Sequence, residues 1–145
     1  MKYWIMTIFF LANKLAKLAD EIASEIDSYA VCLTMDTLKV FSTVMNLEDK
    51  KRRLCNFKVL ADFFKSKLDK EQLEIVKKYL IKGDSFEQIA YGTGLSRSTT
   101  IRRYNSAINK SIAACLSLTY DEDRLMEEYK DFPVIIKTLG KFKTS

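Results

Sequence analysis

The amino-acid sequence predicts an all-α fold. Only four glycines and one proline occur among its 145 residues, too few for the many turns of a β-sandwich or barrel. Apolar residues recur every three or four positions through most of the chain, which is the period of an α-helix. Hydrophobic residues make up 48% and charged residues 30% of the chain, a balance typical of globular proteins. We therefore expect a multi-helix bundle with a long N-terminal helix.

The first helix is expected over roughly residues 3–29. Its apolar stripe contains Leu11, Leu15, Leu18, Ile22 and Ile26, and a parallel stripe of small residues contains Ala12, Ala16, Ala19 and Ala23. A face this wide serves an intramolecular core or a dimer seam equally well, and both alternatives stay open. The apolar run from Tyr3 to Ala12 is too short to cross a bilayer as a helix. A charged helical pattern follows it instead of a signal-peptide cleavage region.

Two further helical patterns flank a basic run. Residues 36–47 form a short apolar segment that Asp36 is placed to cap, and residues 54–68 form another. Between them lie four consecutive cations, Lys50 to Arg53. At the start of a helix these cations would be disfavoured by the helix dipole, and an anionic partner such as a phosphate backbone would relieve that cost. The alternative is a solvated surface.

Cap signals mark the remaining elements. Asp69 with Gln72 predicts a helix start, and Gly83 predicts its end. Thr119 with Glu122 predicts another start. A last short helix is expected to open at residues 131–133 and to end near Gly140.

Residues 85–112 predict a short helix, a glycine turn and a longer second helix. Ser85 and Gln88 form a Ser-x-x-Gln capping box that begins the first helix. Gly94 is placed to take the left-handed conformation that such a turn requires. Ser96 caps the second helix.

The second helix of this pair has two contrasting faces. On a wheel of about 100° per residue, one side holds Ile101, Tyr104, Ile108, Ile112 and Cys115, and the opposite side holds Thr99, Arg102, Arg103, Ser106 and Lys110. No acidic residue occurs from Ser96 to Leu118, whereas an ordinary surface helix mixes Glu and Lys to form ion pairs. Arginine can bridge two guanine acceptors or clamp a phosphate, and short hydroxyl side chains allow close approach to DNA. This outer face therefore has the chemistry of major-groove readout.

The positive charge is concentrated in the middle of the chain. The net charge is +5 overall. Residues 49–68 carry seven basic and two acidic side chains, and residues 85–112 carry four and one, whereas residues 1–48 carry four and six. A localised basic stripe is typical of proteins that bind polyanions.

These elements resemble a known family. The matching pieces are Leu-Asp-Lys-Glu-Gln at 68–72, Ser-Phe-Glu-Gln-Ile-Ala at 85–90, Gly-Leu-Ser at 94–96 and Ala-Ile at 107–108. Together, residues 67–112 resemble region 4 of bacterial sigma factors of the sigma-70 class, and the related region-4-like regulators of phages such as ArpU-type proteins. The resemblance implies a helix-turn-helix whose second helix binds promoter or operator DNA, and often a contact with RNA polymerase.

The resemblance is partial in two respects. The buried positions of the family's second helix would fall on Thr100 and Arg103, whereas the apolar residues here are Ile101 and Tyr104, one place later. Either the turn is slightly longer or the helix is rotated. In addition, residues 1–66 contain no counterpart of the family's region 2, so a complete sigma factor is not expected.

The composition argues against catalysis. The chain has no histidine, which removes the usual nucleophile–histidine catalytic sites and histidine-ligated zinc. Cys32, Cys55 and Cys115 match neither a disulfide framework nor a metal knuckle, so we expect buried thiols in a reducing cytoplasm. The acidic cluster at 121–128 is explained by a solvated helix start. We therefore expect no enzyme activity, no metal and no cofactor.

Together these features predict a cytoplasmic, sequence-specific DNA-binding transcriptional regulator. Its expected regions are 1–66 for dimerisation or partner docking, 67–118 for the helix-turn-helix, and 119–145 for short C-terminal helices. The residues expected to contact DNA are Ser96, Arg97, Ser98, Thr99, Arg102, Arg103, Ser106 and Lys110, with Lys50, Lys51, Arg52 and Arg53 as a second phosphate-binding group.

The expected partners are double-stranded DNA, RNA polymerase, and a second copy bound through the N-terminal helix, with no small-molecule substrate. A two-fold dimer would favour a palindromic site. The alternative function is a helical interaction module that binds a partner protein or a membrane surface without DNA.

Overall fold

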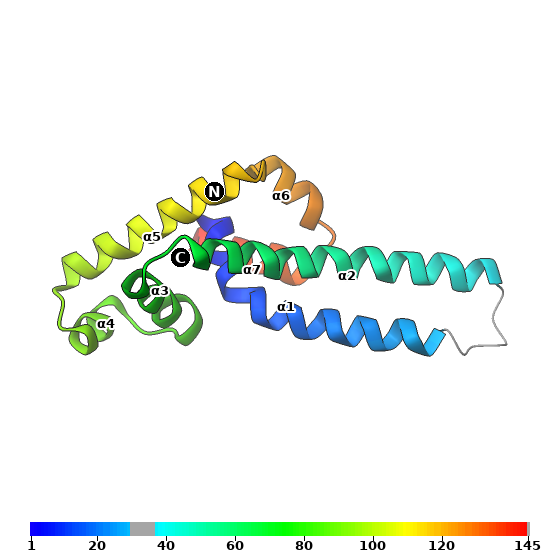
Figure 1. The fold of residues 1–145 in the computed structure, drawn as a ribbon, viewed down its shortest axis with the longest axis horizontal. Coiled ribbons are helices and arrows are strands. Elements are labelled where there is room, and N and C mark those ends of the chain that lie inside the picture. The colour runs from blue at the N-terminus through cyan, green and yellow to red at the C-terminus, as the bar shows by residue number, and fades with distance from the viewer. Residues whose placement is uncertain (30–36, 145) are drawn as a thin grey trace. The chain divides into compact units, whose positions relative to one another are not determined.

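The structure confirms the all-α fold. It is a computed structural model that describes residues 1–29 and 37–144, and every element in these ranges is helical (Figure 1). The elements are α1 (Lys2–Tyr29), α2 (Thr37–Ser66), α3 (Lys70–Val76), the π-helical segment η1 (Lys77–Lys82), α4 (Phe86–Thr93), α5 (Arg97–Ser117), α6 (Glu122–Tyr129) and α7 (Pro133–Thr144).

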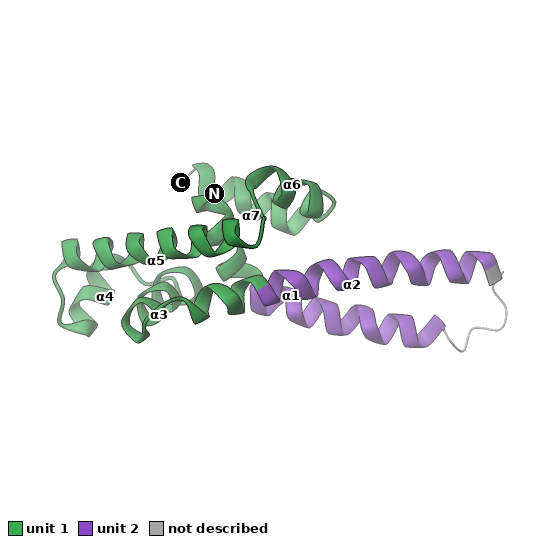
Figure 2. Ribbon diagram, turned by 45° about the horizontal axis from the view of Figure 1, so that its top comes forward, with its two compact units in different colours: residues 1–11, 60–145 green, residues 12–59 purple. Residues whose placement is uncertain are grey.

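The chain forms two compact units (Figure 2). One unit consists of residues 12–59, in which the described parts of α1 and α2 lie side by side as an antiparallel pair. Leu15, Ala19 and Ile22 of α1 and Leu54 and Phe57 of α2 are buried. The wide apolar face of α1 is therefore part of the intramolecular core, the first of the two alternatives that the sequence left open.

The structure corrects the number of helices in this region. The apolar residues from Leu38 to Leu47 and from Leu54 to Phe64 belong to the single helix α2 (Thr37–Ser66), which continues through the basic run. Asp49 stabilises this stretch because it accepts hydrogen bonds from Arg52 Nη2 at 3.1 Å and Arg53 Nε at 2.9 Å, one turn further along. The basic run therefore lies in mid-helix, where the argument from the helix dipole does not apply. Asp36, the expected cap, lies outside the described residues.

The second unit consists of residues 1–11 and 60–145, described to residue 144. Its core includes the first turns of α1, where Ile5 and Ile8 are fully buried, and Phe9 packs edge-on against Phe64 with ring centroids 5.8 Å apart. Leu125 of α6 and Ile135 of α7 are also fully buried. The expected helix-turn-helix region and the short C-terminal helices thus belong to one unit.

Local cap signals define the central helices as expected. Asp69 and Gln72 form a reciprocal capping box at the start of α3, and Ser85 and Gln88 form another at α4. Gly83 ends η1 with φ 84°. Each of these predictions is confirmed.

Two expected boundaries at the C-terminal end are wrong. Asp121, not Thr119, caps α6, because its carboxylate accepts from the Arg124 amide at 2.8 Å. Thr119 instead has a left-handed backbone with φ 63°. The last helix continues past Gly140 to Thr144, since Phe142 beyond the glycine packs against another aromatic ring.

The cysteines differ in their surroundings. Cys115 is buried, its thiol donates to the Tyr120 carbonyl at 3.2 Å, and burial raises its pKa to about 11. Cys55 is exposed, contrary to the expectation of buried thiols. Cys32 lies outside the described residues.

Within residues 1–29 and 37–144, no helix combines the length and the apolar character needed to cross a membrane.

The glycines of α4 provide a matched stability test. Gly94 has φ 73°, and a Cβ there would meet no atom within 4 Å, so Gly94→Ala introduces backbone strain alone. We expect it to lower the free energy of unfolding by about 1–2 kcal/mol. Gly92 lies inside α4, so Gly92→Ala should raise that free energy by about 0.5 kcal/mol. Urea unfolding followed by circular dichroism measures both, and equal effects would contradict the left-handed turn.

Candidate nucleic-acid interface

The turn between α4 and α5 is built from Gly94, Leu95 and Ser96. Gly94 provides the left-handed C-cap of α4, and Ser96 is the N-cap of α5. The Ser96 hydroxyl accepts from the Thr99 amide at 3.1 Å and donates to the Thr99 hydroxyl at 2.8 Å. Two of the residues expected to contact DNA therefore also hold the first turn of α5 in place.

The structure shows which side of α5 faces the core. Its buried residues are Thr100, Tyr104, Ala107, Ile108, Ser111, Ala114 and Cys115. Thr100 is buried, and its hydroxyl donates a hydrogen bond to the Ser96 carbonyl at 2.9 Å. Ile101 was expected on the buried side but lines a depression on the outer side.

Three aromatic rings fix this rotation of α5. Tyr79 of η1 stacks on Phe86 of α4 with centroids 4.2 Å apart, and both rings meet Tyr104 edge-on at 4.8 and 5.3 Å. Tyr104 is only 3% exposed. Burial raises the pKa of Tyr104, and its hydroxyl has no hydrogen-bond partner among the described residues. Since Tyr104 faces inward, Arg102 and Ser106 on the far side of the helix face outward.

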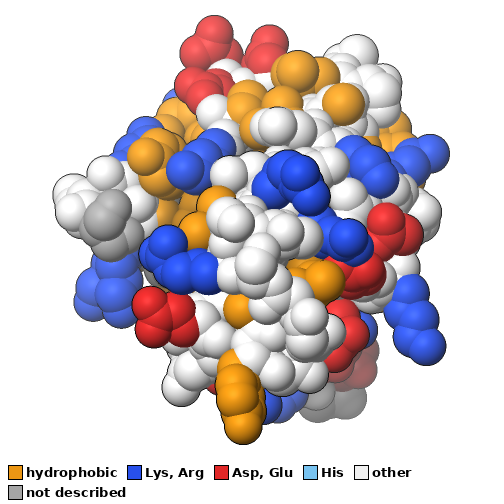
Figure 3. Space-filling view, turned by 90° about the vertical axis from the view of Figure 1, so that its left-hand side faces the viewer, with side chains coloured by type: hydrophobic (Ala, Val, Ile, Leu, Met, Phe, Trp, Pro, Cys, Tyr) orange, Lys and Arg blue, Asp and Glu red, His pale blue; other side chains and the backbone are white. Residues whose placement is uncertain are grey.

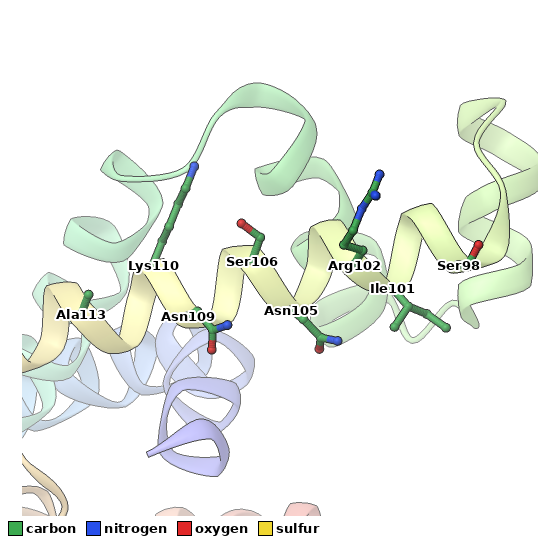
Figure 4. A pocket seen from close by; sticks show the side chains of 8 residues that line it. All are labelled: Ser98, Ile101, Arg102, Asn105, Ser106, Asn109, Lys110 and Ala113. Atoms are coloured by element: carbon green, nitrogen blue, oxygen red, sulfur yellow. The ribbon is translucent and has the colours of Figure 1, made fainter.

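The outer face of α5 is a shallow depression of about 720 Å³. It is lined by Ser98, Ile101, Arg102, Asn105, Ser106, Asn109, Lys110 and Ala113 (Figure 4). Figure 4 shows two rows along the helix, with Arg102, Ser106 and Lys110 on one side and Ile101, Asn105 and Asn109 on the other. This face offers hydrogen-bond donors and acceptors together with positive charge.

Gln72 of α3 connects two of the predicted DNA-contacting residues to the helix before the pair. Its side chain donates to the Ser106 hydroxyl at 3.2 Å and accepts from Lys110 Nζ at 3.0 Å. Gln72 is 6% exposed, so these contacts lie at the edge of the α3–α5 packing. The capping glutamine of α3 therefore also orients the outer face of α5.

Acidic residues from neighbouring helices pair with two of the arginines. Arg103 forms an ion pair with Glu71 of α3. Arg97 Nε lies 3.8 Å from a carboxylate oxygen of Glu87 on α4. Figure 3 views the end of the molecule that carries the α4–α5 turn, and it shows basic side chains among uncharged ones with acidic side chains close by. The sequence of α5 contains no acid, but in the folded protein Glu71 and Glu87 offset part of the positive charge of this helix.

Arg102 is the exposed cation at the centre of this face. It borders the depression along α5 and a second one, of about 340 Å³, next to Asp69 and Gln72 of α3. It makes no ion pair with any described residue.

The second predicted phosphate-binding group lies elsewhere. Lys50, Lys51, Arg52 and Arg53 are in mid-α2, within the unit of residues 12–59. Lys50 and Arg52 are exposed, whereas Lys51 and Arg53 are half-buried. Hydrogen bonds from Arg53 and Arg52 lower the pKa of Asp49, so two of the four cations already face a carboxylate.

Sequence reasoning missed Asn105, Asn109 and Gln72. Both asparagines are exposed on the outer face, and an asparagine amide can form paired hydrogen bonds to adenine. A wider sector of the helical wheel would have included them. No local signal shows that Gln72 reaches α5, because that contact spans more than thirty residues.

No cluster of potential metal ligands occurs in the described part of the chain. Comparisons of the chain with protein-family models, with curated proteins and with solved structures found no match.

The unpartnered hydroxyl of Tyr104 leads to a stability prediction. A buried hydroxyl without a hydrogen bond costs about 1–3 kcal/mol. We expect Tyr104→Phe, which keeps the ring, to raise the free energy of unfolding by about 1 kcal/mol. Tyr104→Ala removes the ring and should lower it by about 3–5 kcal/mol. Chemical unfolding measures both, and a loss of stability in Tyr104→Phe would show that the hydroxyl makes a stabilising bond.

Proposed function

We propose that this protein is a sequence-specific DNA-binding transcriptional regulator in which α4, the turn and α5 act as a helix-turn-helix. The observation that carries the proposal is the outer face of α5, which presents arginine, lysine, serine and asparagine opposite a fixed apolar side. A capped helix of this composition, held rigidly by its neighbours, fits the major groove of B-DNA.

The outward-facing residues along α5 have different roles in this proposal. Ser98 and Thr99, on the first turn, are short and allow the start of the helix to approach base edges. Arg102 is long enough to reach a guanine edge or a phosphate. Lys110 lies two turns further along and serves as a phosphate anchor.

Arg103 contributes differently from Arg102. Its guanidinium is paired with Glu71 in the free protein, so a phosphate must displace or share that carboxylate. An ion pair at this degree of exposure stabilises a protein by roughly 0–1 kcal/mol. Replacing the Glu71 ion pair by a phosphate contact therefore costs little free energy, but it reduces the net contribution of Arg103 to DNA binding.

A salt series tests the interface directly. Fluorescence anisotropy with a random-sequence duplex gives the dissociation constant (Kd) between low and moderate salt. Each neutralised phosphate contributes about −0.9 to the slope of log K against log salt. We expect Arg102→Ala to make the slope shallower by about 0.9, and Arg102→Ala/Arg103→Ala to make it shallower still by a smaller amount.

The matched control is Lys141→Ala, which removes the same charge from an exposed position of α7. It should leave the slope unchanged. Equal losses in Arg102→Ala and Lys141→Ala would indicate attraction by net charge alone. No binding at low salt by a folded protein would exclude the DNA interface and leave the helical interaction module as the function to pursue.

The Glu71–Arg103 pair generates a prediction of opposite sign. Glu71→Gln removes the carboxylate but keeps a side chain of similar size. We expect tighter binding to the same duplex and a slope steeper by up to about 0.9, because Arg103 becomes available to phosphate. Folding stability should change by less than about 1 kcal/mol, since the pair is exposed.

The control for this variant is Glu74→Gln, which removes an acid of α3 that pairs with Lys78 on the same helical segment. It changes the net charge equally, and we expect a smaller effect on the slope. Weaker binding by Glu71→Gln would show that Glu71 orients Arg103 for DNA instead of competing for it.

A further inference from the structure

An apolar stripe on α2 is exposed to solvent. Phe41 is 65%, Met45 53% and Val59 61% exposed. Glu48, Arg52 and Cys55 lie between them and are also exposed. The steps along this stripe alternate between three and four residues, which is the heptad spacing of a helix that packs against another helix.

This stripe is separate from the face that α2 buries. Leu54, Phe57 and Ala61 are fully buried, and they lie about 160° around the helix from the exposed stripe. The α2 helix thus has one apolar side within the chain and a second that no described residue covers. Large exposed hydrophobic side chains at regular spacing mark an interaction surface.

The stripe is complementary to itself when reversed about residue 50. Reversal places Phe41 opposite Val59, Met45 opposite Cys55, and Glu48 opposite Arg52. Each apolar residue meets an apolar one, and the acid meets the base. We propose that α2 pairs with α2 of a second copy of this chain as an antiparallel, two-fold symmetric helix pair centred near Lys50.

A parallel pair would be unfavourable on the same surface. In a parallel pair each residue faces its own copy, so Glu48 would meet Glu48 and Arg52 would meet Arg52. Like charges in the seam oppose association. In the antiparallel pair two Glu48–Arg52 contacts form instead, and a two-fold interface of this kind closes at a dimer. Arg52 also contacts Asp49 of its own chain at 3.1 Å, and an exposed arginine can serve both carboxylates.

The pairing has a consequence for DNA recognition that rests on the proposed function. A two-fold dimer presents two copies of α5 in inverted orientation, which favours an inverted-repeat site. The pairing itself does not depend on DNA binding, so its tests are done without DNA.

The first test is site-directed crosslinking in the full chain with Cys32 replaced by serine. In the antiparallel pair, Cys55 lies about 15 Å along the helix from Cys55 of the second copy. A bismaleimide whose linker is shorter than this distance cannot join the two thiols. Met45→Cys places a thiol opposite Cys55 of the second copy. We expect a covalent dimer from Met45→Cys and almost none from the parent chain. Asn46→Cys, an exposed neighbour on another face of α2, is the matched control.

The second test exchanges the charges. Glu48→Arg and Arg52→Glu should each weaken dimerisation at least about tenfold in sedimentation equilibrium, because like charges then meet twice. The double variant Glu48→Arg/Arg52→Glu restores opposite charges and should recover most of the affinity. Circular dichroism of each variant confirms that α2 remains folded.

Several results would overturn the proposal. A parent chain that crosslinks through Cys55 indicates a parallel pair. Equal crosslinking of Met45→Cys and Asn46→Cys indicates random collision, and a folded chain that stays monomeric at high concentration excludes the pair. Failure of the double variant to recover dimerisation excludes the Glu48–Arg52 contact. If DNA binding is absent but these tests succeed, only the proposed function fails.

Discussion

The contact among Tyr79, Phe86 and Tyr104 is the constraint on which the candidate interface depends. The three rings come from η1, α4 and α5, so a single cluster fixes three consecutive elements against one another. Offset-stacked and edge-on ring pairs stabilise a specific geometry beyond the burial of area. With Tyr104 held inward, the rotation of α5 is set, and its outward residues follow from the helical period. The unpartnered hydroxyl of Tyr104 is a cost that this packing must outweigh.

Features encoded within a few residues could be predicted from the sequence. The capping boxes at α3 and α4, the N-cap Ser96 and the left-handed Gly94 all depend on contacts between residues at most four apart. The continuity of α2 could not be predicted as readily. A run of four cations suggested a boundary, but Asp49 balances two of them within the helix. The start of α6 was misplaced because Thr119 and Asp121 are both good capping residues, and the left-handed backbone of Thr119 decides between them.

The electrostatics of the interface illustrate a second limit of sequence reasoning. The absence of acids from Ser96 to Leu118 is a property of α5 alone. Glu71 and Glu87, which approach Arg103 and Arg97, belong to helices that come earlier in the chain. Pattern analysis of one helix cannot include charges that tertiary packing brings to it. The same packing turns Ile101 outward and leaves it half-buried, because Thr100 takes the inward position, where its hydroxyl bonds to the Ser96 carbonyl.

The internal partners of these cations influence how a phosphate would compete for them. Lys110 and Arg103 have polar partners in the free protein, and an arginine or lysine side chain loses about 2 kcal/mol of rotamer entropy when it is fully fixed. Contacts to Gln72 and Glu71 already impose part of that loss in the free protein. The partners differ, however, since Gln72 is neutral and leaves the charge of Lys110 intact, whereas Glu71 offsets the charge of Arg103. In the proposed interface, preorganisation would therefore favour Lys110 over Arg103 as a phosphate contact. Arg103 is held in position by Glu71, but the same carboxylate weakens its long-range attraction for a phosphate.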